Sequence, residues 1–198
     1  MGMLVSVVGN TGVGKTTFVN QFCALNNFPA FLEGNEERPF QDLFAQELAR
    51  YALTNQVDFL ISRARQEIEI RKENTCGIQD GGLELDYNVY SKLFFQKGYL
   101  SSAEFKLCQQ VYQLVREFLA PPDLFVYLHA PVKVITQRFQ HRGHRLRIAQ
   151  VEDMHTMEDL LSTWIETLSP EKVLIIESAE QTQDYASGIQ TLTQRLKS

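Results

Sequence analysis

Short apolar runs rich in β-branched residues alternate along this chain with longer segments in which apolar and polar positions follow a helical spacing. The apolar runs predict five strands, over residues 3–8, 28–33, 75–79, 124–128 and 173–176. The longer segments predict helices over residues 15–25, 40–72, 87–96, 101–119, 132–141, 152–168 and 184–196. A break near Thr54 is expected to divide the second of these segments into two helices. This alternation favours an α/β fold with a parallel five-stranded sheet and helices on both faces, which binds ligands at the carboxyl ends of its strands.

Composition and charge narrow the class of protein. The chain has 198 residues, 44% hydrophobic and 22% charged, so we expect one globular domain over residues 1–198. The net charge of −5 argues against a nucleic-acid partner, and no apolar run reaches the roughly 18 residues of a membrane-spanning helix. Cys23, Cys76 and Cys108 lie far apart without a paired motif, which predicts reduced thiols in the cytoplasm.

The first predicted strand runs directly into a glycine-rich motif. Residues 9–16 match G-x-x-x-x-G-K-[ST] without a gap, between a predicted strand and a predicted helix. Backbone N–H groups of such a P-loop surround a polyphosphate, its lysine reaches the β and γ phosphates, and its hydroxyl binds Mg²⁺. The motif therefore predicts a P-loop NTPase-type fold that binds a nucleoside triphosphate and Mg²⁺. The residues expected at the phosphates are Asn10, Thr11, Gly12, Val13, Gly14, Lys15, Thr16 and Thr17. Among them, Lys15 is also expected to act in catalysis and Thr16 to bind the metal.

Candidate acceptor residues follow the second strand and occupy the long helical segment. Glu33 ends the second predicted strand, where a carboxylate can take the proton of an attacking hydroxyl; the alternative is a solvated loop acid. Gln56 and Arg63 are seven residues apart and share one helix face. A glutamine amide offers a donor and an acceptor to the edge of a base, while an ordinary solvated helix face is the alternative.

A cationic stretch lies late in this acidic chain. Residues 124–151 contain five basic residues and no acidic one. Arg138, Arg142 and Arg145 are spaced four and three apart and form one helical stripe. We expect an arginine-rich lid over residues 142–151, with Arg138 and Arg142 at the donor phosphates and Arg142 in catalysis. A solvated basic helix face or a nucleic-acid patch is the alternative.

With these residues in place, the sequence resembles the deoxynucleoside kinase family, especially its bacterial deoxyadenosine/deoxyguanosine kinase branch. The resemblance rests on Glu33, on residues 50–56 and 60–65, and on the Pro-Asp-Leu strand at 122–131. It implies Glu33 as the catalytic base that also contacts substrate.

The same resemblance assigns roles to four more residues. It implies that Gln56 and Arg63 contact the base, that Asp80 lies on the Mg²⁺ side, and that Asp86 reads the base from the opposite side. It also implies a homodimer formed through the helices at 87–96 and 101–119, for which ordinary core packing is the alternative.

The sequence departs from the family pattern at three places. Asp80-Gly81-Gly82 stands where the family has [DE]-R-S, so the arginine and serine are replaced by glycines. His144 replaces the second lid arginine, and Arg145 or Arg147 is a possible substitute. No tyrosine precedes Gln56 at the usual position for the sugar, unless Tyr51 or Tyr87 serves there.

The sequence thus favours ATP-dependent phosphorylation of the 5′-hydroxyl of a deoxynucleoside, with purine deoxynucleosides preferred. Two alternatives use the same P-loop: a nucleoside-monophosphate or other small-molecule kinase, and a nucleotide-binding protein that has lost catalysis. Nucleic-acid binding through the lid is the least favoured, because the chain as a whole is acidic.

Overall fold

The order of elements alternates strands and helices along most of the chain. The computed structural model describes residues 2–32, 38–73, 75–141, 150–178 and 185–197. The strands are β1 (Met3–Val8), β2 (Ala30–Phe31), β3 (Cys76–Asp80), β4 (Leu124–His129) and β5 (Val173–Glu177). The helices of the first half are α1 (Lys15–Asn26), α2 (Pro39–Gln46), α3 (Leu48–Lys72), α4 (Leu83–Leu85), the π-helical η2 (Asp86–Ser91) and α5 (Lys92–Gln96). Those of the second half are α6 (Ser102–Phe118), α7 (Val132–His141), α8 (Asp153–Ile165), the 3₁₀ turn η3 (Pro170–Lys172) and α9 (Ala186–Arg195).

The five strands form one parallel sheet in the order β2-β3-β1-β4-β5, which confirms the predicted fold class. Val7 of β1 pairs with Asp80 of β3, and Val8 pairs with Tyr127 of β4. The strand order reverses at β1, where the connections leave toward both sides of the sheet, and ligands bind at such a switch point. The segment after β1 is the phosphate motif, so the topology places it at the centre of the sheet's carboxyl edge.

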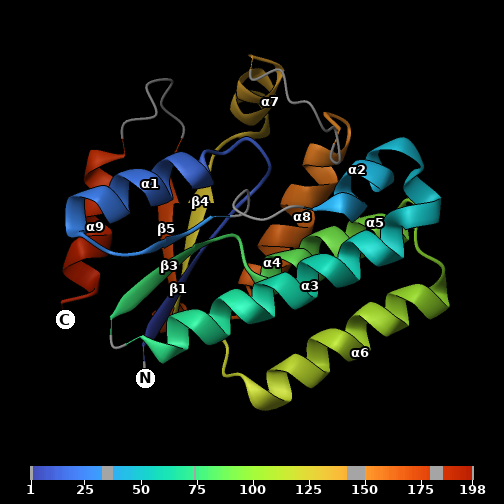
Figure 1. The fold of residues 1–198 in the computed structure, drawn as a ribbon. Coiled ribbons are helices and arrows are strands. Elements are labelled where there is room, and N and C mark those ends of the chain that lie inside the picture. The colour runs from blue at the N-terminus through green and yellow to red at the C-terminus, as the bar shows by residue number, and fades with distance from the viewer. Residues whose placement is uncertain (1, 33–37, 74, 142–149, 179–184, 198) are drawn as a thin grey trace.

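Alternating side chains of the strands supply two separate cores. On one face, Val5, Val7 and Val126 pack with residues of α1, α7 and α9. On the other face, Val8 and Phe125 pack with residues of α3, α8 and the helical run from α4 to α5. Figure 1 shows α1 and α9 together on one side, and α3 on the other side with α6 outside it. The predicted cover of helices on both faces is therefore confirmed.

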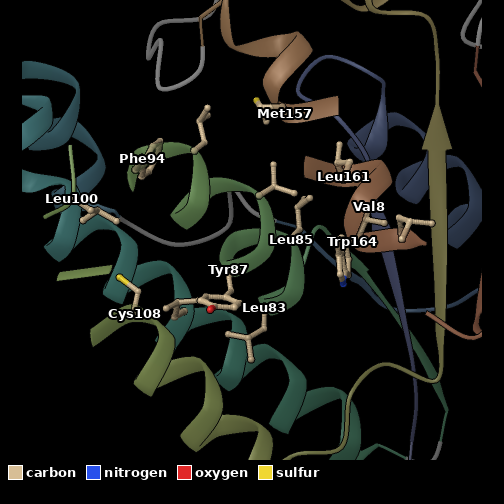
Figure 2. Packing of buried hydrophobic residues seen from close by; sticks show 14 of the residues in the cluster. Val8, Leu83, Leu85, Tyr87, Phe94, Leu100, Cys108, Met157, Leu161 and Trp164 are labelled. Carbon is tan, nitrogen blue, oxygen red and sulfur yellow. The ribbon is translucent and has the colours of Figure 1, made fainter. Parts of the chain in front are cut away.

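The core on the α3 side is built around an aromatic stack. The ring of Tyr87 lies parallel to that of Tyr112, with centroids 4.3 Å apart, and also stacks on Phe105 of α6. Figure 2 shows Tyr87 among Leu83, Leu85 and Cys108. On the sheet side of this core, Trp164 meets Phe125 edge-on at 5.4 Å. The stack joins η2, which carries Asp86, rigidly to α6.

Three element boundaries differ from the sequence prediction. The break in the long helical segment lies at Glu47, whose backbone leaves the helical region, and not near Thr54, whose hydroxyl bonds Tyr51 O within α3. The helix predicted from 87 begins at Leu83 and passes through the π-helical turn η2. Of the described part of the strand predicted over 28–33, only Ala30–Phe31 is a strand. It begins after Pro29, which lacks an N–H and only accepts from Ile78, at 3.3 Å.

The predicted start of α6 is confirmed at its cap. Ser101 accepts a hydrogen bond from Glu104 N, and the Glu104 carboxylate accepts from Ser101 N at 2.7 Å, which completes a capping box. Within the described ranges, no helix combines the length and the apolar character needed to cross a membrane.

A buried ion cluster ties α3, α4 and α6 together. Nη1 and Nη2 of Arg116 donate to the two carboxylate oxygens of Glu67 at 2.7 and 2.8 Å, and Nε lies 2.5 Å from Glu84 Oε1. The Glu67 and Glu84 side chains are only 0% and 4% exposed. Burial, opposed by the charge of Arg116 and reinforced by that of Glu67, raises the pKa of Glu84 to about 7. One guanidinium cannot neutralise two buried carboxylates, so folding favours a protonated Glu84.

We expect the free energy of unfolding to fall as pH rises through about 7. The pKa of Glu84 is about 7 in the folded protein, above its usual 4.5. The stabilisation that comes from the protonated carboxyl is therefore complete below pH 4.5 and is lost as pH rises to about 7. Glu84→Gln stays neutral and should flatten this part of the profile in urea denaturation at a series of pH values. Glu171→Gln, an exposed carboxylate on η3, is the control that should leave the slope unchanged. Equal slopes for Glu84→Gln and the wild type would contradict the assignment.

Candidate active site

The phosphate motif forms a turn between β1 and α1, and the last residue of this turn, Gly14, has to be a glycine. Gly14 has φ +109° and directly precedes α1, and a Cβ there would lie 1.9 Å from the Tyr185 hydroxyl. No side chain of the described residues caps the start of α1. Uncapped N–H groups at a helix start, behind a glycine-rich turn, bind phosphate oxygens.

Lys15 and Thr16 begin α1 at the centre of this site. Nζ of Lys15 donates to Gly9 O at 3.0 Å and to Asn10 O at 3.1 Å, so the ammonium lies over the loop. Thr16 Oγ1 donates to Asp80 Oδ2 at 2.5 Å. A hydroxyl and a carboxylate, brought together from α1 and the end of β3, are the oxygen ligands that Mg²⁺ prefers. The described residues thus fit the predicted metal, and Thr17 follows in the first turn of α1.

The first half of the loop is held by α8 and η2. Nδ2 of Asn10 donates to Met154 O and to Glu158 Oε2, each at 2.9 Å, and Asn10 Oδ1 accepts from Thr11 N. The Tyr127 hydroxyl donates to the other oxygen of Glu158, and burial together with this bond raises the pKa of Tyr127. The Thr11 hydroxyl lies 2.9 Å from that of Tyr90, a residue of η2.

Arg138 binds the outside of the loop. Its Nη1 donates to Val13 O at 3.0 Å and to Ser178 Oγ at 3.1 Å, and its Nη2 donates to Ser178 O at 2.7 Å. Gly12 lies against the same helix, because a Cβ there would be 3.5 Å from Phe139 Cβ. Arg138 therefore reaches the phosphate motif through its backbone, and direct contact with a phosphate stays a prediction.

A second polar cluster joins α3 to η2. The guanidinium of Arg63 is fully buried, and its Nε donates to Asp86 Oδ2 at 2.9 Å. Its Nη1 donates to Gln66 Oε1 at 3.2 Å, and Nε2 of Gln56 donates to Asp86 O at 2.7 Å. The structure thus brings together all three residues that the sequence singled out for the base.

One glycine, Gly81, connects this cluster to the phosphate loop. Gly81 has φ +83° and donates from its N–H to Val7 O at 2.9 Å. A Cβ at this position would lie 2.9 Å from Nη2 of Arg63. The carbonyl of Gly81 accepts a short hydrogen bond from the Ser6 hydroxyl. Asp80 on the metal side and Arg63 on the base side therefore flank one short turn.

Other predicted residues lie outside the described ranges. Glu33 and Arg142 are among them, as is most of the predicted lid, residues 142–149. The chain next to Glu33 is described: Leu32 O accepts from Gln66 Nε2 at 3.3 Å. Gln66 in turn accepts from Arg63, so the segment that leads to Glu33 starts beside the second cluster.

Sequence reasoning missed the residues that support the site from a distance. These are Tyr90, Glu158, Ser178 and Tyr185 around the loop, and Gln66 beside Arg63. Ser178 directly follows the last strand, and the rule that sites lie after strand ends points to it. The other four carry no local motif.

Comparison with known proteins agrees with this geometry. Deoxyadenosine/deoxycytidine kinase of Bacillus subtilis (strain 168) is 24% identical over 159 residues, which cover 77% of this chain and 73% of the relative. Deoxyguanosine kinase of the same organism is 24% identical over 140 residues, 70% of this chain and 66% of the relative. The solved structure of deoxyadenosine kinase from M. mycoides with dCMP and a flexible dCDP superposes with a TM-score of 0.83 at 18% identity, over 98% of this chain and 99% of that one. This likeness shows a shared fold.

A family model decides the assignment. The model described as "Deoxynucleoside kinase" matches residues 5–197, a span that includes the phosphate loop, Asp80, and the cluster of Gln56, Arg63 and Asp86. Since the match covers nearly the whole chain, the chain belongs to the deoxynucleoside kinase family, the transferases that phosphorylate deoxynucleosides.

Proposed function

We propose that this chain transfers the γ-phosphoryl group of ATP to the 5′-hydroxyl of a deoxynucleoside, with purine deoxynucleosides preferred. The observation that carries the proposal is the turn at Gly81, which has Asp80 and the phosphate loop on one side and Arg63 on the other. A donor site and an acceptor site on opposite sides of one turn suit an in-line transfer. Each of the two Bacillus subtilis relatives is named for a purine deoxynucleoside, the first for deoxyadenosine together with deoxycytidine and the second for deoxyguanosine, which supports the purine preference.

On the donor side, the loop N–H groups and Lys15 hold the phosphates of ATP. Thr16 and Asp80 hold Mg²⁺, which neutralises charge on the phosphate oxygens. Arg142 is proposed to approach the transferred group from the lid and to stabilise its equatorial oxygens. Nζ of Lys15 lies 3.0 and 3.1 Å from two carbonyl oxygens of the loop, which holds the ammonium at the proposed phosphate site.

On the acceptor side, Gln56, Arg63 and Asp86 bind the edge of the base. The amide of Gln56 and the carboxylate of Asp86 together offer donors and acceptors, as recognition of a base requires. Arg63 fixes the orientation of the Asp86 side chain through the bond from Nε at 2.9 Å. Glu33, the second residue after β2, takes the proton from the 5′-hydroxyl as it attacks.

The direct test is a turnover screen. Purified protein with ATP and Mg²⁺ is offered each deoxynucleoside and each deoxynucleoside monophosphate, and products are separated by chromatography. We expect monophosphates from deoxyadenosine or deoxyguanosine, and a loss of at least about 100-fold in Lys15→Ala, because the lysine stabilises the transferring charge. Lys133→Ala, a lysine of α7, is the matched control. Diphosphates formed from monophosphates would instead favour a monophosphate kinase, and ATP binding without any product would favour the non-catalytic alternative.

The turn at Gly81 allows a sharper test of the acceptor side. Gly81→Ala forces a Cβ to within 2.9 Å of Nη2 of Arg63, so the guanidinium must move away from Asp86. We expect the KM for the deoxynucleoside to rise about tenfold while the KM for ATP changes little, since a charged hydrogen bond contributes about 1.5–3 kcal/mol.

Gly98→Ala is the matched control for the backbone. Gly98 also has a positive φ, +72°, but nothing lies within 4 Å of its Cβ position. Both variants should lose about 1–2 kcal/mol of unfolding free energy to backbone strain. Only Gly81→Ala should also weaken the buried pair of Arg63 and change the deoxynucleoside KM. Equal kinetic effects in the two variants would refute the role given to Arg63.

We also propose that the chain forms a homodimer through α6. One stripe of this helix, Phe105, Cys108 and Tyr112, packs inward. A second apolar stripe faces outward, with Leu114 56% and Phe118 79% exposed. Figure 1 shows α6 as the outermost helix beyond α3. A helix with apolar stripes on both sides, in the outer layer, has the character of an association surface.

The dimer is tested by sedimentation equilibrium. We expect the wild type to sediment as a dimer and the double variant Leu114→Glu, Phe118→Glu to sediment as a monomer, because buried carboxylates without partners oppose association. Leu25→Glu, at an apolar residue of α1 that is 73% exposed, is the control and should remain dimeric. A wild type that is monomeric at every concentration would contradict the proposal.

We place the reaction in the cytoplasm. Cys23, Cys76 and Cys108 are free thiols. Burial, as the largest cause, raises the pKa of Cys23 to about 12 and that of Cys108 to about 11, so both stay protonated and unreactive. Thiols of this kind suit a reducing compartment.

A further inference from the structure

Three polar groups from distant parts of the chain lie within hydrogen-bond distance of one backbone oxygen of the phosphate loop. The carbonyl oxygen of Val13 lies 3.0 Å from Nη1 of Arg138, 3.1 Å from Oγ of Ser178 and 3.2 Å from the phenol oxygen of Tyr185. Ser178 directly follows β5, and Tyr185 directly precedes α9. Oγ of Ser178 and the phenol oxygen of Tyr185 are themselves 3.3 Å apart.

We call Arg138, Ser178 and Tyr185 the anchor of this carbonyl. The two residues that carry its hydroxyls are buried, and the phenol is held in place. Ser178 and Tyr185 are 5% and 3% exposed, and Val13 is fully buried. The ring of Phe18 meets that of Tyr185 edge-on, with centroids 5.5 Å apart. The Tyr185 hydroxyl also lies so close to Gly14 that a Cβ there would be 1.9 Å away. The phenol therefore has one position, directly behind the peptide that joins Val13 to Gly14.

The proton count of this anchor is complete. The guanidinium of Arg138 can only donate, whereas each hydroxyl has one proton and also accepts. One hydroxyl donates to the Val13 carbonyl, and the other donates to that hydroxyl across the 3.3 Å contact. Removal of either hydroxyl thus weakens the bond of the other to the loop.

We propose that Tyr185 and Ser178 are positioning residues for the phosphate donor, because they fix the orientation of the Val13–Gly14 peptide. A trans peptide is planar, so its C=O and N–H point in opposite directions. When the Val13 carbonyl is held outward, the Gly14 N–H points to the opposite side, where the loop receives phosphate. Without the anchor this peptide turns easily, because Gly14 has no Cβ to restrict it. The inference rests on the proposed role of residues 9–16 as the donor site.

The test compares Tyr185→Phe, which keeps the buried ring, with the wild type. Calorimetry measures the binding of ADP and of inorganic tripolyphosphate, and kinetics give both KM values. We expect affinity for the two phosphate ligands to fall about three- to tenfold, the effect of one net hydrogen bond. The KM for ATP should rise by the same factor, while the KM for the deoxynucleoside stays unchanged. Tyr99→Phe, at a half-buried tyrosine after α5, is the control and should change neither.

A second variant keeps the result clear if Tyr185→Phe folds poorly. Ser178→Ala should weaken phosphate binding by a similar factor, and the double variant should be little worse than either, because the two hydroxyls act as one unit. The inference is overturned if both single variants bind ADP and tripolyphosphate like the wild type, or if they weaken both substrates equally. A wild type that binds neither phosphate ligand overturns the donor site itself and the proposed function with it.

Discussion

A fully buried guanidinium, that of Arg63, is the group on which the arrangement of the site depends. A charge in the interior has to be paired, and breaking a buried pair costs about 3–5 kcal/mol. Arg63 meets this need with Asp86 and Gln66, at 2.9 and 3.2 Å. Its Nη2 lies 2.9 Å from the point where the Cβ of a residue 81 with a side chain would stand. Arg63 is therefore paired in this place only if η2 and α3 keep their positions and residue 81 has no Cβ.

This geometry gives physical meaning to the departure at Asp80-Gly81-Gly82. The family pattern has an arginine at position 81, whereas this chain has glycine there, with Nη2 of Arg63 2.9 Å from the Cβ position. Positive charge is thus present beside the turn, although it is held by Asp86 and comes from another element. The π-helical form of η2 supports the same cluster, since the Asp86 carbonyl accepts from the Gln56 amide at 2.7 Å and from the Ser91 hydroxyl at 3.0 Å. A π-helical turn in such a place agrees with their frequent occurrence at functional sites.

The phosphate loop shows how a glycine-rich segment acquires a defined shape. Its glycines permit the turn but do not select one conformation. One conformation is selected by hydrogen bonds from outside the loop. Residues of α8 bind Asn10, and Arg138 of α7 and Tyr185 before α9 bind the Val13 carbonyl. Donors that are fixed before the ligand arrives stabilise developing charge without reorganisation, so these distant contacts bear directly on phosphoryl transfer.

The sequence alone determined the parts that depend on neighbouring residues. Local periodicity predicts strands β1, β4 and β5 and the helices α1, α6 and α7, and eight consecutive residues predict the phosphate motif. Periodicity did not predict the break at Glu47, the short β2 or the π-helical η2, because the surrounding packing decides where such segments end.

Only the tertiary structure decided how the site is supported. Spacing predicted that Gln56 and Arg63 share a helix face, but their burial against Asp86 depends on how α3 packs on η2. Tyr185 is 172 residues from Val13, and Glu158 is 148 residues from Asn10. Contacts at such separations leave no local pattern, because they form only when the strand order brings the ends of β1 and β5 and the helix α8 to one edge of the sheet.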